Sequence, residues 1–165
     1  MTTTIEKPYM LTRDGLESLQ AELEELTTTG REKIAERLAR AFDDGQDDDF
    51  VDNAELEKAR QEQAFLEGRV QTIQGILRNY EVIDENRKRS KFVQVGDWIT
   101  VSEVGDDLTE KYQLVGAAEA DPLTGRISYE SPLGAALLGS VVGDVVEFDA
   151  PGGTIQFEIK KKGRK

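Results

Sequence analysis

The sequence predicts an α+β protein in which an antiparallel α-helical coiled-coil hairpin precedes a small β-sheet domain with one short helix. Apolar residues recur at heptad spacing in two runs before residue 81, which indicates paired helices. Short alternating runs separated by turn signals follow residue 93, which indicates strands. The composition, 38% hydrophobic and 33% charged over 165 residues, is typical of a chain with a long solvated helical part.

The first helix of the hairpin is predicted to begin after Thr12, a suitable N-cap, with Asp14 in its first turn. Four leucines then follow at steps of three, four and three residues, namely Leu16, Leu19, Leu23 and Leu26. Residues 27–30 (Thr-Thr-Thr-Gly) lower the helix propensity, and the apolar positions resume out of heptad phase at Ile34, Leu38 and Ala41. We expect one continuous helix with a kink or stutter near Gly30, or a short break there.

The second helix shows a cleaner heptad pattern. Its seam steps alternately by three and four residues through Leu56, Ala59, Gln63, Leu66, Val70, Ile73, Leu77 and Tyr80. Each run is roughly 25 to 30 residues long, about 40 Å at 1.5 Å per residue. Because the runs match in length and a polar turn separates them, folding back on each other would bury both seams, and the hairpin is assigned to residues 1–85.

A linker is assigned to residues 86–92 and the β-rich domain to residues 93–165. Val82 and Ile83, just before the linker, fit either a strand or the end of the helix. Strands are predicted at 97–101, 111–115, 126–129, 145–148 and 154–159, with a short helix at 132–138 that has proline in its first turn. Five aromatic residues are expected to pack in the core: Trp98, Tyr112, Tyr129, Phe148 and Phe157. The lysine-rich end, 160–165, is expected to be a solvated tail.

Composition excludes several classes of function. A net charge of −12 argues against nonspecific binding to duplex nucleic acid, which requires a basic surface. The absence of cysteine and histidine excludes disulfides, zinc sites of the usual ligands and histidine-based catalytic triads. No apolar run approaches the roughly 20 residues that cross a bilayer, and the N-terminus lacks the pattern of a secretion signal. We therefore expect a cytoplasmic protein without a membrane partner.

The turn of the hairpin, residues 43–55, carries six aspartates within ten residues. Their mutual repulsion costs stability, and capping the second helix requires one or two of them. One interpretation is a solvated acidic loop that keeps the hairpin soluble. The other is a site for a hard cation such as Mg²⁺, Mn²⁺ or Ca²⁺, although the spacing does not match an EF-hand loop. Exposed carboxylates of this kind could complete a metal site whose other ligands come from a partner.

Several ordered motifs resemble those of bacterial transcript-cleavage factors of the GreA/GreB family. They are residues 49–56 (Asp-Phe-Val-Asp-Asn-Ala-Glu-Leu), 59–63, 67–70, 82–84, 95–97, 131–139, 142–144 and 151–153. The resemblance extends over about residues 11–159. It implies an FKBP-like fold for the C-terminal domain, which would dock at the rim of the secondary channel of bacterial RNA polymerase. The hairpin would enter that channel.

The resemblance also implies roles for the tip. Asp49 and Asp52 would help to hold a catalytic Mg²⁺ shared with the polymerase active site, Asp49 as ligand and Asp52 as ligand or water-orienting base. The polymerase would then cut the 3′ end of backtracked nascent RNA, so the protein is expected to be neither an enzyme nor a stable metal binder by itself. Supporting tip residues would be Asp43, Asp44, Asp47, Asp48, Phe50, Asn53 and Glu55.

Two further sets of residues are contact candidates. A basic strip on the first helix consists of Arg31, Lys33, Arg37 and Arg40. It could contact RNA phosphates, or it could form salt bridges with Glu32, Glu36 and the second helix. On the C-terminal domain, the loop 119–121 and the segment 131–133 are candidates for the contact with polymerase, through Asp121, Ser131, Pro132 and Leu133.

The tip departs from the family pattern in one respect, because residues 40–49 are about three residues longer and more acidic. This feature resembles Gre-homologous inhibitors, which occupy the same channel and block catalysis. Inhibition is therefore an alternative to cleavage stimulation. A third possibility is a structural adaptor that assembles through the hairpin. The polar outer faces of both helices disfavour it, and we expect a monomer.

Overall fold

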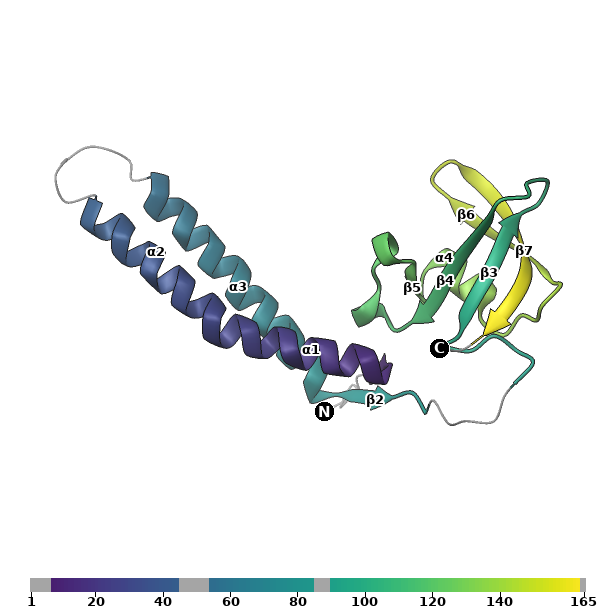
Figure 1. The fold of residues 1–165 in the computed structure, drawn as a ribbon, viewed down its shortest axis with the longest axis horizontal. Helices are drawn as coiled ribbons and strands as arrows, with labels where there is room; N and C mark the ends of the chain where they lie inside the picture. The colour runs from purple at the N-terminus through teal and green to yellow at the C-terminus, as the bar shows by residue number, and fades with distance from the viewer. Residues whose placement is uncertain (1–6, 45–53, 85–89, 164–165) are drawn as a thin grey trace, which may run out of the picture. The chain divides into compact units, whose positions relative to one another are not determined.

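The computed structural model describes residues 7–44, 54–84 and 90–163. Contacts divide the chain into two compact units. The hairpin unit is Glu17–Arg78, and the sheet unit combines the described residues up to Leu16 with those from Asn79 onward. Both units contain the elements that the sequence predicts, which confirms the α+β class (Figure 1).

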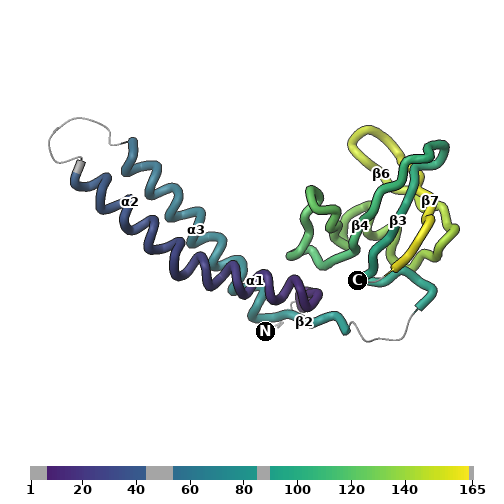
Figure 2. The backbone as a smooth tube through the Cα atoms, in the orientation of Figure 1, coloured from purple at the N-terminus to yellow at the C-terminus, as the bar shows by residue number. Residues whose placement is uncertain are grey.

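The hairpin contains helices α1 (Arg13–Glu25), α2 (Arg31–Asp44) and α3 (Ala54–Arg78), and α2 packs along α3 (Figures 1 and 2). The predicted seam is largely confirmed, and its most buried members are Leu19, Ala41, Ala59, Val70 and Ile73. Two positions differ from the prediction, because Gln63 is exposed and Tyr80 lies beyond the helix. The pattern also omitted Ile76, which is buried.

A single turn of π-helix, η1 (Leu26–Gly30), joins α1 to α2 and confirms the predicted stutter. Continued heptad spacing from Leu26 would place core residues at 33, 37 and 40, whereas the apolar residues stand at 34, 38 and 41. A π-turn accommodates this one extra residue without breaking the helix. Gly30 faces α3 so closely that a Cβ there would lie 2.8 Å from a methyl of Leu66.

The sheet unit holds a five-stranded sheet in the order β5-β4-β3-β7-β6. Its strands are β3 (Trp98–Glu103), β4 (Thr109–Val115), β5 (Arg126–Ser128), β6 (Val145–Ala150) and β7 (Gly153–Gly163), and all neighbours are antiparallel except β4 and β5. Two short 3₁₀ segments follow β4, namely η2 (Ala117–Glu119) and η3 (Pro122–Thr124). The predicted short helix is α4 (Pro132–Leu137), which packs against β6.

The core of the sheet unit lies between the sheet and α4. Its buried members are Val93, Ile99, Val101, Leu114, Leu137, Val146, Phe157 and Ile159. Four of the predicted core aromatics belong to it or pack against it: Tyr112, Tyr129, Phe148 and Phe157. Trp98 is also half-buried but is not part of this cluster, and the amino group of Lys111 lies 4.8 Å from the centre of its ring.

The expectation of a solvated tail is wrong for residues 160–163, which form the end of β7, and residues 161–163 pair with β3. Lys162 turns inward, and its amino group lies 3.1 Å from a carboxylate oxygen of the fully buried Asp97 and donates to the carbonyl of Ser90 at 2.6 Å. Successive side chains of a strand point to opposite faces, so a run of lysines places some of them inward. The buried Asp97 compensates the charge.

A two-stranded parallel sheet was not predicted. It pairs β1 (Tyr9–Leu11) with β2 (Tyr80–Val82) in the register Tyr9 to Tyr80. Tyr80 is therefore in a strand and not in the helical seam. Val82, which by sequence fits either a strand or the end of the helix, lies in β2, but nothing local in the sequence indicates its pairing with β1. Among the described helices, none is long and apolar enough to span a membrane.

Candidate functional site

The predicted site lies at the end of the hairpin where α2 ends at Asp44 and α3 begins at Ala54 (Figure 1). Most of the predicted tip residues lie outside the described residues: Asp47, Asp48, Asp49, Phe50, Asp52 and Asn53. The described part includes Asp43, exposed in the last turn of α2, and Glu55, exposed in the first turn of α3, and the backbone of Asp44 is helical. The two helix ends thus place carboxylates on both sides of the segment 45–53.

The helix dipoles act differently on these carboxylates. Glu55 and Glu57 in the first turn of α3 are favoured by the positive end of the dipole. Asp43 and Asp44 stand at the C-terminal end of α2, where the dipole disfavours negative charge and the last turn has no basic residue. Helix stability therefore does not explain an aspartate at this position.

Carboxylate oxygens are the donors that Mg²⁺ prefers, so the residue types at the tip fit this ion. Within the ranges that the structure describes, no three acidic side chains are grouped closely enough to hold a metal ion. The metal role of Asp49 and Asp52 stays a prediction.

The basic strip takes part in pairing between the helices. The guanidinium of Arg31 donates to both carboxylate oxygens of Glu67, at 2.8 and 2.9 Å, and Arg37 pairs with Glu62. These contacts agree with the salt-bridge interpretation for Arg31 and Arg37. The Nε of Arg40 points to the carbonyl of Glu36 at 3.4 Å, and Lys33 is exposed.

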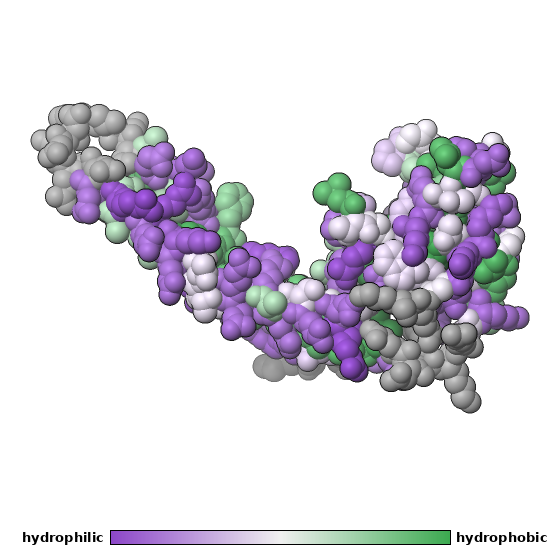
Figure 3. Space-filling model, viewed as in Figure 1, coloured by the Kyte–Doolittle hydropathy of each residue, from purple (hydrophilic) through white to green (hydrophobic). Residues whose placement is uncertain are grey.

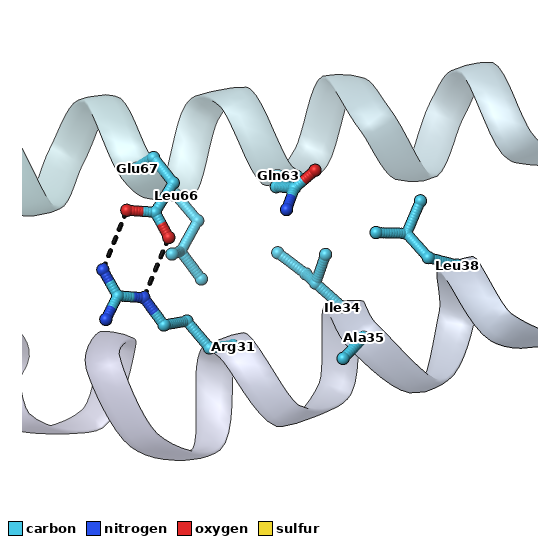
Figure 4. Close-up of a pocket in the computed structure, with 7 residues that line it drawn as sticks. All are labelled: Arg31, Ile34, Ala35, Leu38, Gln63, Leu66 and Glu67. Carbon is cyan, nitrogen blue, oxygen red and sulfur yellow. Dashed lines mark hydrogen bonds and ion pairs between the residues drawn. The ribbon is translucent and has the colours of Figure 1, made fainter.

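A shallow groove of about 240 Å³ lies between α2 and α3 near this strip (Figure 4). It is lined by Arg31, Ile34, Ala35, Leu38, Gln63, Leu66 and Glu67. Gln63 stands at a seam position of α3 and lines the groove opposite the apolar side chains of α2. The Arg31–Glu67 pair borders one end. Elsewhere the visible face of α1 and α2 is mostly hydrophilic (Figure 3).

The candidate contacts on the sheet unit lie in two capped turns. The carboxylate of Asp121 accepts from the backbone N–H of Leu123 at 3.1 Å and from the hydroxyl of Thr124 at 2.9 Å, and Leu123 is 97% exposed. Gly125 follows in the left-handed conformation, at φ 73°. This turn is therefore well defined and open to a partner.

The second turn contains the other three candidates. The hydroxyl of Ser131 accepts from the N–H of Gly134 at 3.1 Å and caps α4, with Pro132 exposed in its first turn. Leu133 is partly buried against the core. A Cβ on Gly134 would lie 1.9 Å from the carbonyl oxygen of Ser128, which explains the glycine.

Glu119 differs from its neighbours in the loop 119–121. Its side chain is only 1% exposed, so the expectation that it faces a partner is wrong. The sequence has no local signal of this burial, because the chain segment that covers Glu119 is the distant N-terminal one.

Two protein-family models match this chain, one in each half. A family model described as "Transcription elongation factor, N-terminal" matches residues 9–82, and one described as "Transcription elongation factor, GreA/GreB, C-term" matches residues 88–162. Both modules are thus those of a transcription elongation factor. The chain belongs to the GreA/GreB family, which confirms the resemblance of the motifs.

Curated relatives named transcription elongation factor GreA match along nearly the whole chain. The protein of Clostridium perfringens is 42% identical over 154 residues, 93% of this chain and 96% of the relative. That of Thermoanaerobacter pseudethanolicus is 43% identical over 155 residues, with the same coverage. That of Lactococcus lactis subsp. cremoris is 41% identical over 157 residues, 95% and 99% of the two chains.

Solved structures of related proteins also match. The Thermus thermophilus GreA factor homolog 1 is 30% identical, with 95% of this chain and 99% of that chain covered and a TM-score of 0.40. The GreA/GreB factor of Nitrosomonas europaea is 20% identical, with 95% and 98% covered and a TM-score of 0.42.

Proposed function

We propose that this protein acts on bacterial RNA polymerase during elongation. The hairpin enters the secondary channel, and its acidic tip stimulates cleavage of the 3′ end of backtracked nascent RNA. The observation that carries the proposal is the position of the acid-rich segment 43–55 between the paired ends of α2 and α3, in a chain of the GreA/GreB family.

The tip supplies ligands, and the polymerase performs the hydrolysis. Asp49 is the proposed ligand of a catalytic Mg²⁺ of the polymerase, and Asp52 is a second ligand or orients the attacking water. A Mg²⁺ held in this way activates water and stabilises the charge that develops at the phosphate. The remaining tip carboxylates increase the local negative potential that attracts the ion. By this proposal the isolated protein binds no metal stably and has no nuclease activity.

Other parts of the chain position the complex. The basic strip Arg31, Lys33, Arg37 and Arg40 is proposed to lie near the phosphates of the extruded RNA. Asp121 and the segment 131–133 are proposed to contact the rim of the channel, which is supported by their two well-defined exposed turns. One copy of the chain suffices for this arrangement, so it acts as a monomer.

The decisive experiment measures RNA cleavage in a stalled, backtracked elongation complex from the same organism. Wild-type protein should shorten the RNA, and Asp49→Ala and Asp52→Ala should abolish the effect. Glu24→Ala, an exposed acidic position in α1, is the matched control and should cleave like the wild type. Cleavage that survives both tip substitutions would contradict the proposed roles.

Inhibition of the polymerase is the second candidate function, favoured by the roughly three extra residues and the additional aspartates of the tip. In that case the same complexes would show no cleavage, and nucleotide addition would slow in a way that the tip substitutions relieve. If the wild type has no effect on the polymerase at all, both functions are wrong and a structural adaptor is left.

A further inference from the structure

The buried carboxylate of Glu119 contacts the beginning of the first hairpin helix. It accepts from the backbone N–H of Thr12 at 2.5 Å and from the hydroxyl of Thr12 at 2.6 Å. The hydroxyl of Thr12 in turn accepts from the N–H of Gly15 at 3.0 Å. The guanidinium of Arg126 pairs with the same carboxylate. All of these residues belong to the sheet unit, although 107 positions separate Thr12 from Glu119.

This arrangement satisfies a charge that would otherwise be costly to bury. A carboxylate removed from water destabilises a protein unless hydrogen bonds and an opposite charge compensate it. Glu119 has both, from Thr12 and Arg126. It also stands at the N-terminal end of α1, where the helix dipole favours a negative charge. The contact is therefore a charge-matched attachment of the helix start to the sheet unit.

Two glycines show how closely the segments approach. A Cβ on Gly15 would lie 2.0 Å from the carboxyl carbon of Glu119, and a Cβ on Gly116 would lie 1.8 Å from the carbonyl oxygen of Met10. Neither glycine has a positive φ, so close approach alone requires the missing side chain. Residues 10–15 and residues 116–119 thus fit each other at two separate points.

Local capping does not require this contact. Thr12 already caps α1 through its own hydroxyl and its carbonyl, which accepts from the N–H of Leu16 at 3.0 Å. Glu119 adds a bond from a distant part of the chain. What it provides is attachment of the helix to the sheet unit, in addition to initiation of the helix.

We propose that Glu119 is a positioning residue that anchors the first turn of α1 to the sheet unit. Because α1 continues without a break from Arg13 to Glu25, a restraint on its first turn acts on the helix from which the hairpin is built. The contact connects the regions matched by the two separate family models, 9–82 and 88–162. Its importance for RNA cleavage rests on the proposed function, whereas the anchor itself does not.

Hydrogen exchange on the full chain tests the anchor directly. The N–H of Thr12 should exchange at least about tenfold faster in Glu119→Gln and Glu119→Ala than in the wild type, because its acceptor is weakened or lost. Amides of β3 and β7 should keep their protection, which separates local release from unfolding. Glu130→Gln, the same chemical change at an exposed site of the sheet unit, should leave Thr12 unchanged. Equal exchange in the Glu119 and Glu130 variants would overturn the proposal.

A double-mutant cycle tests the close approach. In the otherwise wild-type chain, Gly15→Ala should raise the hydrogen-exchange rate of the Thr12 N–H, because the new methyl collides with the carboxylate of Glu119. In the Glu119→Ala variant the same substitution should not raise this exchange rate further, because the carboxylate is absent. Additive effects of the two substitutions would contradict the anchor. If Glu119→Ala does not fold, Glu119→Gln replaces it, and there Gly15→Ala should still be harmful because glutamine fills the same space; a harmless Gly15→Ala in that variant would contradict the close approach.

Cleavage assays then test the functional consequence. With its tip intact, Glu119→Ala should reduce the maximal rate of RNA cleavage at saturating protein by at least about tenfold, since the start of α1 is no longer fixed. A reduction that saturating protein fully corrects would contradict a positioning role. An inactive wild type would refute the proposed function, and the hydrogen-exchange result would still decide whether the anchor exists.

Discussion

At the scale of single residues, charge pairs between the helices contribute to how the hairpin responds to acid. Arg69 donates to both carboxylate oxygens of Glu22, at 2.6 and 2.7 Å. This hydrogen bonding lowers the pKa of Glu22 below its ordinary value of 4.5, although partial burial opposes the shift. The pKa of Glu67 is lowered in the same direction by the hydrogen bond from Arg31. Both carboxylates are therefore charged at neutral pH.

The pair of Glu22 and Arg69 gives a pH-dependent prediction. Because the pKa is lower in the folded protein than in the unfolded chain, the pair stabilises the fold above pH 4.5, and this contribution is lost as the pH falls through the folded-state pKa. Glu22→Gln should lower the free energy of unfolding by about 0.5 kcal/mol at pH 7 and by nothing measurable at pH 2. Urea unfolding at both pH values is the measurement, with the exposed Glu24→Gln as control. A loss that persists at pH 2 would argue against the pair.

The groove between the helices gives a second prediction at this scale. Gln63 occupies a seam position but leaves Ile34 and Leu38 partly uncovered. Gln63→Leu should bury additional apolar surface and raise the free energy of unfolding by about 1 kcal/mol. Thermal unfolding followed by circular dichroism measures the change. Gln61→Leu, on the exposed face of α3, should give no gain, and an equal gain in both variants would show that the groove is not the cause.

At the scale of elements, the π-turn η1 shows how a local irregularity preserves a long-range pattern. The extra residue between Leu26 and Ile34 would rotate the rest of the helix by about 100° if the helix stayed regular. The π-turn absorbs it, so that Ile34, Leu38 and Ala41 still face α3. The hydroxyls of Thr27 and Thr28 contribute by donating to the carbonyls of Leu23 and Glu24, at 2.7 and 2.6 Å.

This explanation predicts the effect of shortening the turn. Deletion of Thr28 moves the following core residues to positions 33, 37 and 40, which restores heptad spacing. The variant should form a regular α-helix, and its free energy of unfolding should be within about 1 kcal/mol of that of the wild type. Deletion of Glu36 is the control, because α2 has no π-turn to absorb it and both Leu38 and Ala41 leave the seam. The Glu36 deletion should lower the free energy of unfolding by about 2 to 4 kcal/mol. Equal losses in guanidinium unfolding would contradict the account.

At the scale of the whole molecule, charge limits the partners that the chain can bind directly. The net charge is −12, and two of the cations in the basic strip, Arg31 and Arg37, are paired with glutamates of α3. Nonspecific binding to duplex DNA gains its free energy when basic side chains neutralise phosphates and the counterions of the DNA are released into solution, and a net charge of −12 does not favour this. Recognition of nucleic acid would therefore depend on a protein partner that already holds it.

The corresponding prediction concerns the protein without polymerase. It should not retard a duplex DNA fragment in a gel-shift assay at micromolar concentration and about 150 mM salt, and lowering the salt should not produce binding. A strongly basic DNA-binding protein assayed in parallel shows that the conditions can detect retention. Salt-sensitive retention by this chain would mean that a local basic surface outweighs the net charge.

The sequence by itself determined the elements that repeat a local pattern. Leucines at steps of three and four residues predicted both helices, and the one-residue change of phase predicted the stutter at Gly30, because helical geometry relates only near neighbours. Alternation and turn residues predicted the five strands. The aspartates of the tip stood out because helix capping does not explain them, and the ordered motifs identified the family.

Only the tertiary structure decided how distant segments meet. It paired Tyr9 with Tyr80, and it turned Lys162 inward to Asp97. It also buried Glu119, which looks like an ordinary loop residue, against Thr12 at the start of α1. In each case the partner lies 65 or more positions away along the chain. The spacing of residues along the chain cannot predict such a contact, because the packing of the complete fold determines which distant residues meet.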